Sequence, residues 1–232
     1  MERILITGAN RGLGLEFVRQ YSDAGSRIFA TCRNPETATA LQALQASHPD
    51  RLSVLPLDVT DEASIRACLA AIGEQTDALD VLINNAGIFI RGERPDTLDA
   101  GAMLNVFHVN AIGPLMVARQ ALDLLRKGNR PRIINITSRL GSITLKQSGG
   151  NYSYCASKAA LNMLTRTLSF DVRADGIIAV MLHPGWVQTD MGGQEAPLKP
   201  EESIRGMRAV IESLRPEDSG RFLQWDGEEL PW

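Results

Sequence analysis

The chain has 232 residues, of which 44% are hydrophobic and 22% are charged, and its formal net charge is −3 at pH 7. These values are typical of a globular protein that can bury a sizeable core. The small negative charge gives no electrostatic case for binding nucleic acid or an anionic membrane. We also expect no membrane-spanning helix, because no apolar run approaches the length that a bilayer requires.

The cysteines and the first residues of the chain indicate in which cellular compartment the protein works. Cys32, Cys68 and Cys155 are odd in number and show no C-x-x-C spacing, which argues against a disulfide framework or a zinc site. Residues 1–8 enter a strand pattern at once, so we expect no signal or transit peptide. A reducing, cytoplasmic location is therefore predicted.

The first predicted strand runs into a glycine-rich turn. Ile4–Ile6 is apolar, Gly8, Gly12 and Gly14 follow, and a helix is predicted from Leu15. Glycines allow a tight turn and close backbone approach, and the helix N-terminus then offers free N–H groups to a phosphate. The spacing is G-x-x-x-G-x-G, and a plain strand-to-helix turn is the alternative.

Two arginines indicate which dinucleotide this turn would bind. The second predicted strand, residues 27–31, is followed by Arg33 at the position where an NAD site usually carries an acidic residue. Arg11 lies inside the glycine turn. Guanidinium groups bind phosphate oxygens in a bidentate manner, so the pair predicts the 2′-phosphate of NADP(H). The alternative is two solvated arginines.

Strand and helix patterns then alternate. A helix is predicted over residues 36–47, a strand over 52–57, a helix capped by Thr60 or Asp61, and a strand over 80–84. The strands are continuous apolar runs, which indicates a parallel sheet covered on both faces. The predicted fold class is therefore α/β, a Rossmann-type doubly wound parallel sheet of about seven strands with helices on both faces.

A polar loop, residues 88–99, leads to a long predicted helix over residues 101–127, which contains Pro114. Proline has no N–H, so the carbonyl of Asn110 is left without its helical partner. We expect a helix irregularity that offers a free acceptor, for instance to a water. A simple packing kink explains the proline equally well.

Tyr154 and Lys158 lie on one predicted helix, residues 154–174, and project from the same face one turn apart. A nearby lysine cation favours the phenolate, so it is expected to lower the pKa of the tyrosine and make it a useful proton-transfer group. A surface tyrosine with a solvated lysine is the alternative for this motif alone.

The remaining elements complete a single predicted domain, residues 1–232. Strands are predicted over 132–137, 177–182 and 220–225, a last helix over 200–214, and a mobile substrate loop over 186–200. In parallel sheets, ligands bind beyond the carboxyl ends of the strands. Several chemically capable residues fall at those ends, namely Arg33, Asp58, Asn84, Ser138 and Pro184.

With these motifs in place, the sequence resembles the short-chain dehydrogenase/reductase family across nearly its whole length. The matching pieces are Thr7–Gly14, Asp58-Val59, Asn84–Gly87, Asn110, Ser138, Tyr154-x-x-x-Lys158, Pro184-Gly185 and Thr189. The stretches 183–193 and 226–232 are similar to the sniffer-type carbonyl reductase and C-factor-like branch. No catalytic position departs from the family pattern.

The resemblance implies a catalytic set. Tyr154 would protonate the carbonyl oxygen during hydride delivery, and Lys158 would lower its pKa and hold the nicotinamide ribose. Ser138 would donate a hydrogen bond to the carbonyl oxygen. Asn110 would hold, through its backbone carbonyl, a water that relays protons to Lys158. Asp58 and the 84–87 turn would lie along the adenine side, and Thr189 near the carboxamide.

The implied contacts with NADP(H) are more numerous. They comprise Gly8, Asn10, Arg11, Gly12, Leu13, Gly14, Arg33, Asp58, Val59, Asn84, Ala86, Gly87, Tyr154, Lys158, Pro184, Gly185, Val187 and Thr189. No metal is expected, since the three histidines show no ligand spacing. His108 and His183 are interpreted as structural, and no histidine is given a catalytic role.

Two functions remain open. The first is an NADPH-dependent reductase of aldehydes or ketones, reversible as an alcohol dehydrogenase, and the second is an NADP(H)-binding regulatory protein with little turnover. A partly apolar substrate pocket is predicted from Phe89, Leu140, Tyr152, Trp186 and Met191, with ordinary packing as the alternative for each. The family resemblance implies a homodimer or homotetramer through the two long helices, with small residues such as Ala156, Ala159 and Ala160 allowing close packing there or against the sheet.

Overall fold

A computed structural model describes residues 1–232 of the protein. Seven strands form one sheet in the order β3-β2-β1-β4-β5-β6-β7, and every pairing is parallel. The strands are β1 (Arg3–Ile6), β2 (Arg27–Cys32), β3 (Leu52–Pro56), β4 (Val81–Asn84), β5 (Arg132–Ile136), β6 (Ile178–His183) and β7 (Phe222–Gln224). The predicted doubly wound α/β fold is confirmed.

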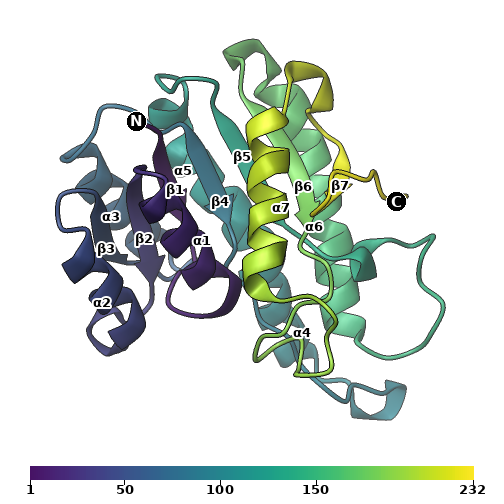
Figure 1. The fold of residues 1–232 in the computed structure, drawn as a ribbon. Coiled ribbons are helices and arrows are strands. Elements are labelled where there is room, and N and C mark those ends of the chain that lie inside the picture. Colours follow the sequence, from purple (N-terminus) through teal and green to yellow (C-terminus); the bar gives the residue numbers. More distant parts are fainter.

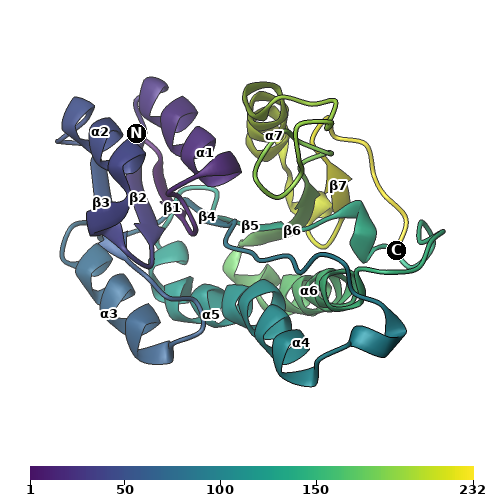
Figure 2. The same ribbon diagram turned by 90° about the horizontal axis from the view of Figure 1, so that it is seen from below.

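Helices cover both faces of the sheet (Figures 1 and 2). One face carries α1 (Gly12–Asp23), α2 (Thr39–Ser47) and α7 (Pro200–Ser213), and the other carries α3 (Glu62–Gly73), α4 (Ala100–Phe107), α5 (Gly113–Leu125) and α6 (Tyr152–Asp171). Each layer closes over its own apolar core, of 25 and 19 buried residues. Because both faces are covered, strands β4, β5 and β6 are buried along their whole length, as their continuous apolar sequences predicted.

The strand order reverses at the centre of the sheet. From β1 the chain moves outward through β2 and β3, and then returns to place β4 on the other side of β1. The loops that follow β1 and β4 therefore diverge, one above and one below the sheet, at its carboxyl edge. Such a switch point is where open α/β sheets bind ligands.

Several element bounds differ from the predicted ones. Helix α1 begins at Gly12 rather than at Leu15, so the last two glycines of the turn belong to its first turn. The predicted 36–47 helix is split into a 3₁₀ turn, Pro35–Thr37, and α2. Helix α6 spans 152–171, and strand β7 is only three residues long. Asp61 caps α3 by accepting a hydrogen bond from the Ala63 amide at 2.8 Å, as predicted.

The long predicted helix is irregular. Between α4 and α5 the chain forms a π turn, His108–Ile112, in which the Gly113 amide bonds to the His108 carbonyl five residues back. A single π turn inside a helix is frequent at functional sites. The irregularity predicted from Pro114 is thus present, and Asn110 lies inside it.

The run Ala100–Leu125 is long and apolar enough to cross a membrane by length and composition, with a mean hydropathy of 1.3. The sequence-based expectation that no apolar run reaches this length was wrong. Helices that pack against a sheet pass the same test, and here Val117, Ala118 and Ala121 are fully buried in the core under the sheet.

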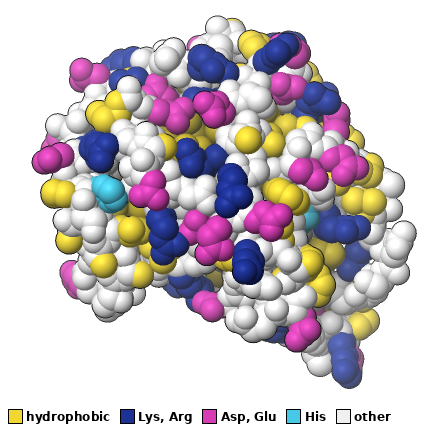
Figure 3. Space-filling model, in the orientation of Figure 1, with side chains coloured by type: hydrophobic (Ala, Val, Ile, Leu, Met, Phe, Trp, Pro, Cys, Tyr) yellow, Lys and Arg dark blue, Asp and Glu magenta, His cyan; other side chains and the backbone are white.

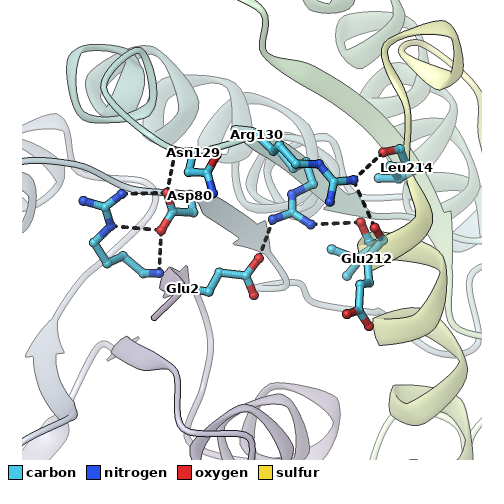
Figure 4. Close-up of polar contacts among 9 residues, drawn as sticks. Glu2, Asp80, Asn129, Arg130, Glu212 and Leu214 are labelled. Carbon is cyan, nitrogen blue, oxygen red and sulfur yellow. Dashed lines mark hydrogen bonds and ion pairs between the residues drawn. The ribbon is translucent and has the colours of Figure 1, made fainter.

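A polar network ties the amino ends of the strands together (Figure 4). The Arg3 side chain donates two hydrogen bonds to Asp80, at 2.9 and 2.7 Å, and the backbone amides of Arg3 and Asn129 donate two more. Burial alone would raise the pKa of Asp80, but these hydrogen bonds outweigh it and hold the pKa below its ordinary value. Arg132 pairs with Glu2 and donates to the Ile211 carbonyl at the end of α7. Ion pairs therefore hold the amino ends of the strands together. The glycine turn and the turn after β4 lie at the opposite, carboxyl edge of the sheet.

The face seen in Figure 3 mixes acidic and basic side chains, without a large area of one sign. This mixture matches the formal net charge of −3.

Candidate active site

Hydrogen bonds join the glycine turn after β1 to the turn after β4. The Thr7 hydroxyl accepts hydrogen bonds from the Asn85 and Ala86 amides at 3.0 and 3.1 Å. The Asn85 side chain donates in return to the carbonyls of Thr7 and Gly8, both at 3.0 Å. Sequence reasoning assigned Asn85 no role, although it stands inside the Asn84–Gly87 motif. Its role is to fix the two turns that border the switch point.

The glycines are required by close backbone approach. Gly8 has φ +64°, and a Cβ there would lie 2.8 Å from the Ala86 Cα. A Cβ at Gly14 would lie 2.2 Å from the Gly8 carbonyl oxygen, which no side chain tolerates. The turn is therefore a concave backbone cradle that only glycine can line.

The cradle fits a dinucleotide phosphate. Helix α1 starts at Gly12 with no side-chain cap and with no acidic residue in its first turn, so its free N–H groups and positive dipole end face the cradle. The exposed Arg11 precedes it, and the exposed Arg33 follows β2 at the same edge. These residues would hold the phosphates of a dinucleotide cofactor.

Asp58 also lies at this edge. Its carboxylate accepts hydrogen bonds from the Thr60 hydroxyl and amide, at 2.7 and 2.9 Å. The hydroxyl bond is the main reason that the pKa of Asp58 lies below its ordinary value, and the positive charge of Arg33 contributes. Arg33 and Asp58, from neighbouring strands, are therefore close enough to interact.

The Asn84 side chain is buried within the sheet, and its contact with the cofactor stays a prediction. It is 2% exposed, and its amide donates to the Asn135 side chain at 2.8 Å and to the Pro114 carbonyl at 3.1 Å. It ties β4 to β5 and to the first turn of α5, because a polar side chain in a buried strand must find partners there. Its Oδ1 is buried and makes no hydrogen bond.

The other predicted contact residues differ in exposure. The exposed ones are Asn10, Arg11, Gly12 and Arg33, and the half-buried ones are Gly8, Leu13, Asp58, Ala86, Gly87, Gly185 and Thr189. The buried ones are Gly14, Val59, Asn84, Pro184 and Val187. Thr189 faces the glycine turn, since its Cγ2 lies 3.6 Å from the position of a Cβ on Gly12.

The four predicted catalytic residues are all buried at the carboxyl edge. Tyr154 and Lys158 come from the first two turns of α6, Ser138 follows β5, and Asn110 lies in the π turn. The Lys158 ammonium is 5.7 Å from the centroid of the Tyr154 ring and donates to the Ile136 carbonyl at 2.8 Å. A Cβ on Gly87 would lie 3.8 Å from that ammonium and 3.4 Å from the Asn110 Oδ1, so the turn after β4 adjoins the same site.

Asn110 connects three segments through its side chain. Its Oδ1 accepts from the Ile88 amide, and its Nδ2 donates to the Ile88 carbonyl, both at 2.9 Å. The same Nδ2 donates at 3.1 Å to the hydroxyl of Ser157, which donates in turn to the Tyr154 carbonyl at 2.8 Å. The π turn thus fixes both the loop after β4 and the helix that carries Tyr154. The water relay from the Asn110 backbone stays a prediction.

The expected lowering of the tyrosine pKa is not what the structure shows. Burial raises the pKa of Tyr154 to about 12, and its interaction with the Ser138 hydroxyl opposes this rise only in part. Burial lowers the pKa of Lys158 to about 8. Spacing on a helix could not reveal either value, because desolvation of the two groups outweighs their mutual effect. A tyrosine with a high pKa stays protonated at neutral pH and so can act as a proton donor.

Two loops border the catalytic set. Phe89, after β4, packs edge-on against Tyr154 with ring centroids 4.9 Å apart. In the 186–200 loop, Trp186 is 56% exposed and donates to the Gly192 carbonyl at 2.8 Å, while Met191 is 39% exposed. Arg91 crosses between the loops and donates to the Met191 carbonyl at 2.8 Å. Leu140 is half-buried and Tyr152 is 37% exposed. Of the five predicted pocket residues, only Phe89 has a ring contact with Tyr154.

His183, at the end of β6, is 4% exposed, and burial lowers its pKa to about 4. It is therefore neutral at pH 7. His108 stands exposed in the π turn, and the structure shows no cluster of histidine, cysteine and acidic residues able to hold a metal ion.

Known proteins share this architecture. The family model of the short chain dehydrogenases matches residues 2–199. The chain is 48% identical over 157 residues to the C-signal protein of Myxococcus xanthus, which covers 68% of this chain and 95% of that protein.

Two solved structures are similar along the whole chain. An NADPH-bound carbonyl reductase from chicken fatty liver is 43% identical with a TM-score of 0.95, covering 100% of this chain and 99% of the other. The carbonyl reductase Sniffer of D. melanogaster is 38% identical with a TM-score of 0.97, covering 100% of both chains. The chain belongs to the short-chain dehydrogenase/reductase family and is an NAD(P)-dependent oxidoreductase.

Proposed function

We propose that the protein is an NADPH-dependent reductase of aldehydes or ketones, able to run in reverse as an alcohol dehydrogenase. The observation that carries the proposal is the convergence of Tyr154, Lys158 and Ser138 beside the glycine cradle, at the switch point of the sheet. The carbonyl reductase neighbours, one of them with NADPH bound, support it.

Each residue of the site has its own role in the proposed carbonyl reduction. Bound NADPH supplies the hydride. Tyr154 gives its proton to the carbonyl oxygen, and its raised pKa keeps that proton in place until a substrate arrives. The Ser138 hydroxyl, which interacts with the phenol, orients the same oxygen. Lys158 and the π turn that carries Asn110 hold the tyrosine and its helix in position.

Turnover can be tested directly by following NADPH absorbance with a panel of small ketones and aldehydes. Oxidation that depends on both the protein and a carbonyl supports the proposal. Tight NADPH binding without turnover on any member of the panel would contradict it and would favour a regulatory role. That second candidate is an NADP(H)-binding signalling protein with little turnover. The similarity to the C-signal protein supports it.

We infer a preference for NADP(H) over NAD(H) from Arg33 and Arg11. In Arg33→Asp, the carboxylate replaces a cation at the end of β2, so we expect the KM for NADPH to rise by about tenfold or more while NADH is used better. Initial rates with each cofactor check this. Arg51→Asp, which reverses a charge away from the cradle, is the control, and an unchanged NADPH/NADH ratio in Arg33→Asp would remove the argument.

We also infer that the protein forms a homo-oligomer through the α4–α6 layer and works in the cytoplasm. Four large apolar side chains of this layer are exposed to solvent. They are Leu104, Ile112, Met163 and Phe170, which are 71%, 44%, 67% and 58% exposed. Met163 and Phe170 are seven residues apart and share one face of α6.

An association of this kind should weaken when a charge enters its apolar contact. Met163→Glu is expected to shift the protein toward smaller species, because a buried unpaired carboxylate is costly. Sedimentation velocity of the wild type and the variant measures the change. Ala40→Glu places the same charge at an exposed position of α2, on the opposite face of the sheet, and should have no effect. A monomeric wild type would contradict the inference.

A further inference from the structure

The segment that follows the β4 turn contacts the site through alternate side chains. Phe89 packs on the ring of Tyr154, Arg91 binds the carbonyls of Asp190 and Met191 at 3.2 and 2.8 Å, and Glu93 binds the start of α6. Gly92, with φ +77°, bends the chain between Arg91 and Glu93. The three side chains join the loop over the cradle to the helix of the proton donor.

The start of α6 needs a partner from outside the helix. Its N-cap residue, Asn151, adopts a left-handed conformation with φ 55° and ψ 38°, and its side chain caps nothing. An N-cap normally has an extended backbone, from which its side chain reaches the second or third amide of the helix. The first turn of α6 also contains no acidic residue. The free amides at this end are therefore left to another group.

Glu93 supplies that group from 60 positions earlier in the chain. Its Oε2 accepts a hydrogen bond from the Ser153 amide at 3.0 Å. Ser153 is the second residue of α6, and Tyr154 is the third. A carboxylate at a helix N-terminus also interacts favourably with the helix dipole. The cap therefore acts on the turn that sets the position of the Tyr154 side chain.

We propose that Glu93 is a positioning residue, whose carboxylate orders the first turn of α6 and thereby holds the Tyr154 phenol at its place of proton transfer. The proposal rests on the proposed reductase function. Phe89 and Arg91, earlier in the same segment, anchor it to the Tyr154 ring and to the 186–200 loop. The cradle for the cofactor lies on other elements, after β1 and β2.

The variants are Glu93→Ala, Glu93→Gln and the control Asp96→Ala. Asp96 is an exposed carboxylate in the same loop and makes no hydrogen bond to α6. In Glu93→Ala we expect kcat to fall by about tenfold while the Kd for NADPH stays within about twofold, because misplacing a catalytic group slows the chemical step more than it weakens binding. Glu93→Gln keeps an oxygen acceptor and should recover most of the rate.

Hydrogen exchange of the free protein gives a readout independent of turnover. The amides of residues 152–155 should exchange about fivefold faster in Glu93→Ala than in Asp96→Ala, which corresponds to the loss of one helix cap. Equal exchange in these two variants would overturn the cap. Faster exchange with an unchanged kcat would overturn the positioning role. A wild type inactive toward every carbonyl would overturn the proposed function, and with it the catalytic meaning of the cap, whereas the exchange data would still decide whether Glu93 orders α6.

Discussion

Tyr154→Phe is expected to lower the rate of carbonyl reduction by about a thousandfold, while the Kd for NADPH stays within about twofold of the wild-type value. The substitution removes only the phenolic oxygen. The ring that packs edge-on against Phe89 remains, and so does the buried position at the first turn of α6. The change therefore removes the proton donor and preserves the shape of the site. Steady-state rates and cofactor binding measured side by side check both parts.

Tyr152→Phe is the matched control. It makes the same chemical change two residues away, on a side chain that is 37% exposed and points to a different face of α6 from Lys158. We expect its rate to stay within about threefold of the wild-type rate. A Tyr154→Phe variant that kept the wild-type rate would contradict the assignment of the proton donor, and a strong loss in Tyr152→Phe would mean that the two tyrosines had been assigned the wrong way round.

The backbone plan of the molecule could be predicted from the sequence because it depends on local patterns. Continuous apolar runs such as Ile177–Leu182 require burial on both faces, and Gly8 and Gly14 mark a turn that side chains cannot line. Parallel strands place all their carboxyl ends on one edge, so Ser138 and Pro184 were expected to be neighbours of the glycine turn.

What escaped prediction depends on contacts between distant segments. Glu93 lies in a loop without periodicity, and only the fold brings it to the Ser153 amide. Asn84 and Asn85 are adjacent in one motif, yet one faces into the sheet and the other binds the glycine turn. The pKa values of Tyr154 and Lys158 reflect burial, which the spacing of the two residues on a helix does not encode.

Lys158→Met is expected to stabilise the protein at pH 7 while it lowers turnover by about a hundredfold or more. Burial lowers the pKa of Lys158 from 10.5 to about 8, so the folded protein at pH 7 holds a charge that it would hold more easily unfolded. A difference of this size corresponds to about 3 kcal/mol. The hydrogen bond from the Lys158 ammonium to the Ile136 carbonyl is lost in the variant, and leaving that buried carbonyl unpaired costs about 2 kcal/mol. Denaturant unfolding should therefore show a net gain of about 1 kcal/mol.

The pH dependence identifies the lysine as the cause. Because the folded pKa is depressed, the unfolded chain binds more protons between pH 8 and 10.5, so the stability of the wild type rises over this window relative to that of the variant. The advantage of Lys158→Met is thus full only well below pH 8, and it disappears before pH 10.5, because the wild type regains more stability over this window than the variant gains at pH 7. Lys127→Met, which removes an exposed lysine, should change stability little at either pH. If Lys158→Met were less stable than the wild type at pH 7, the pKa of Lys158 would not be lowered in the folded protein, and the site would instead stabilise the charged form through its hydrogen bond to Ile136.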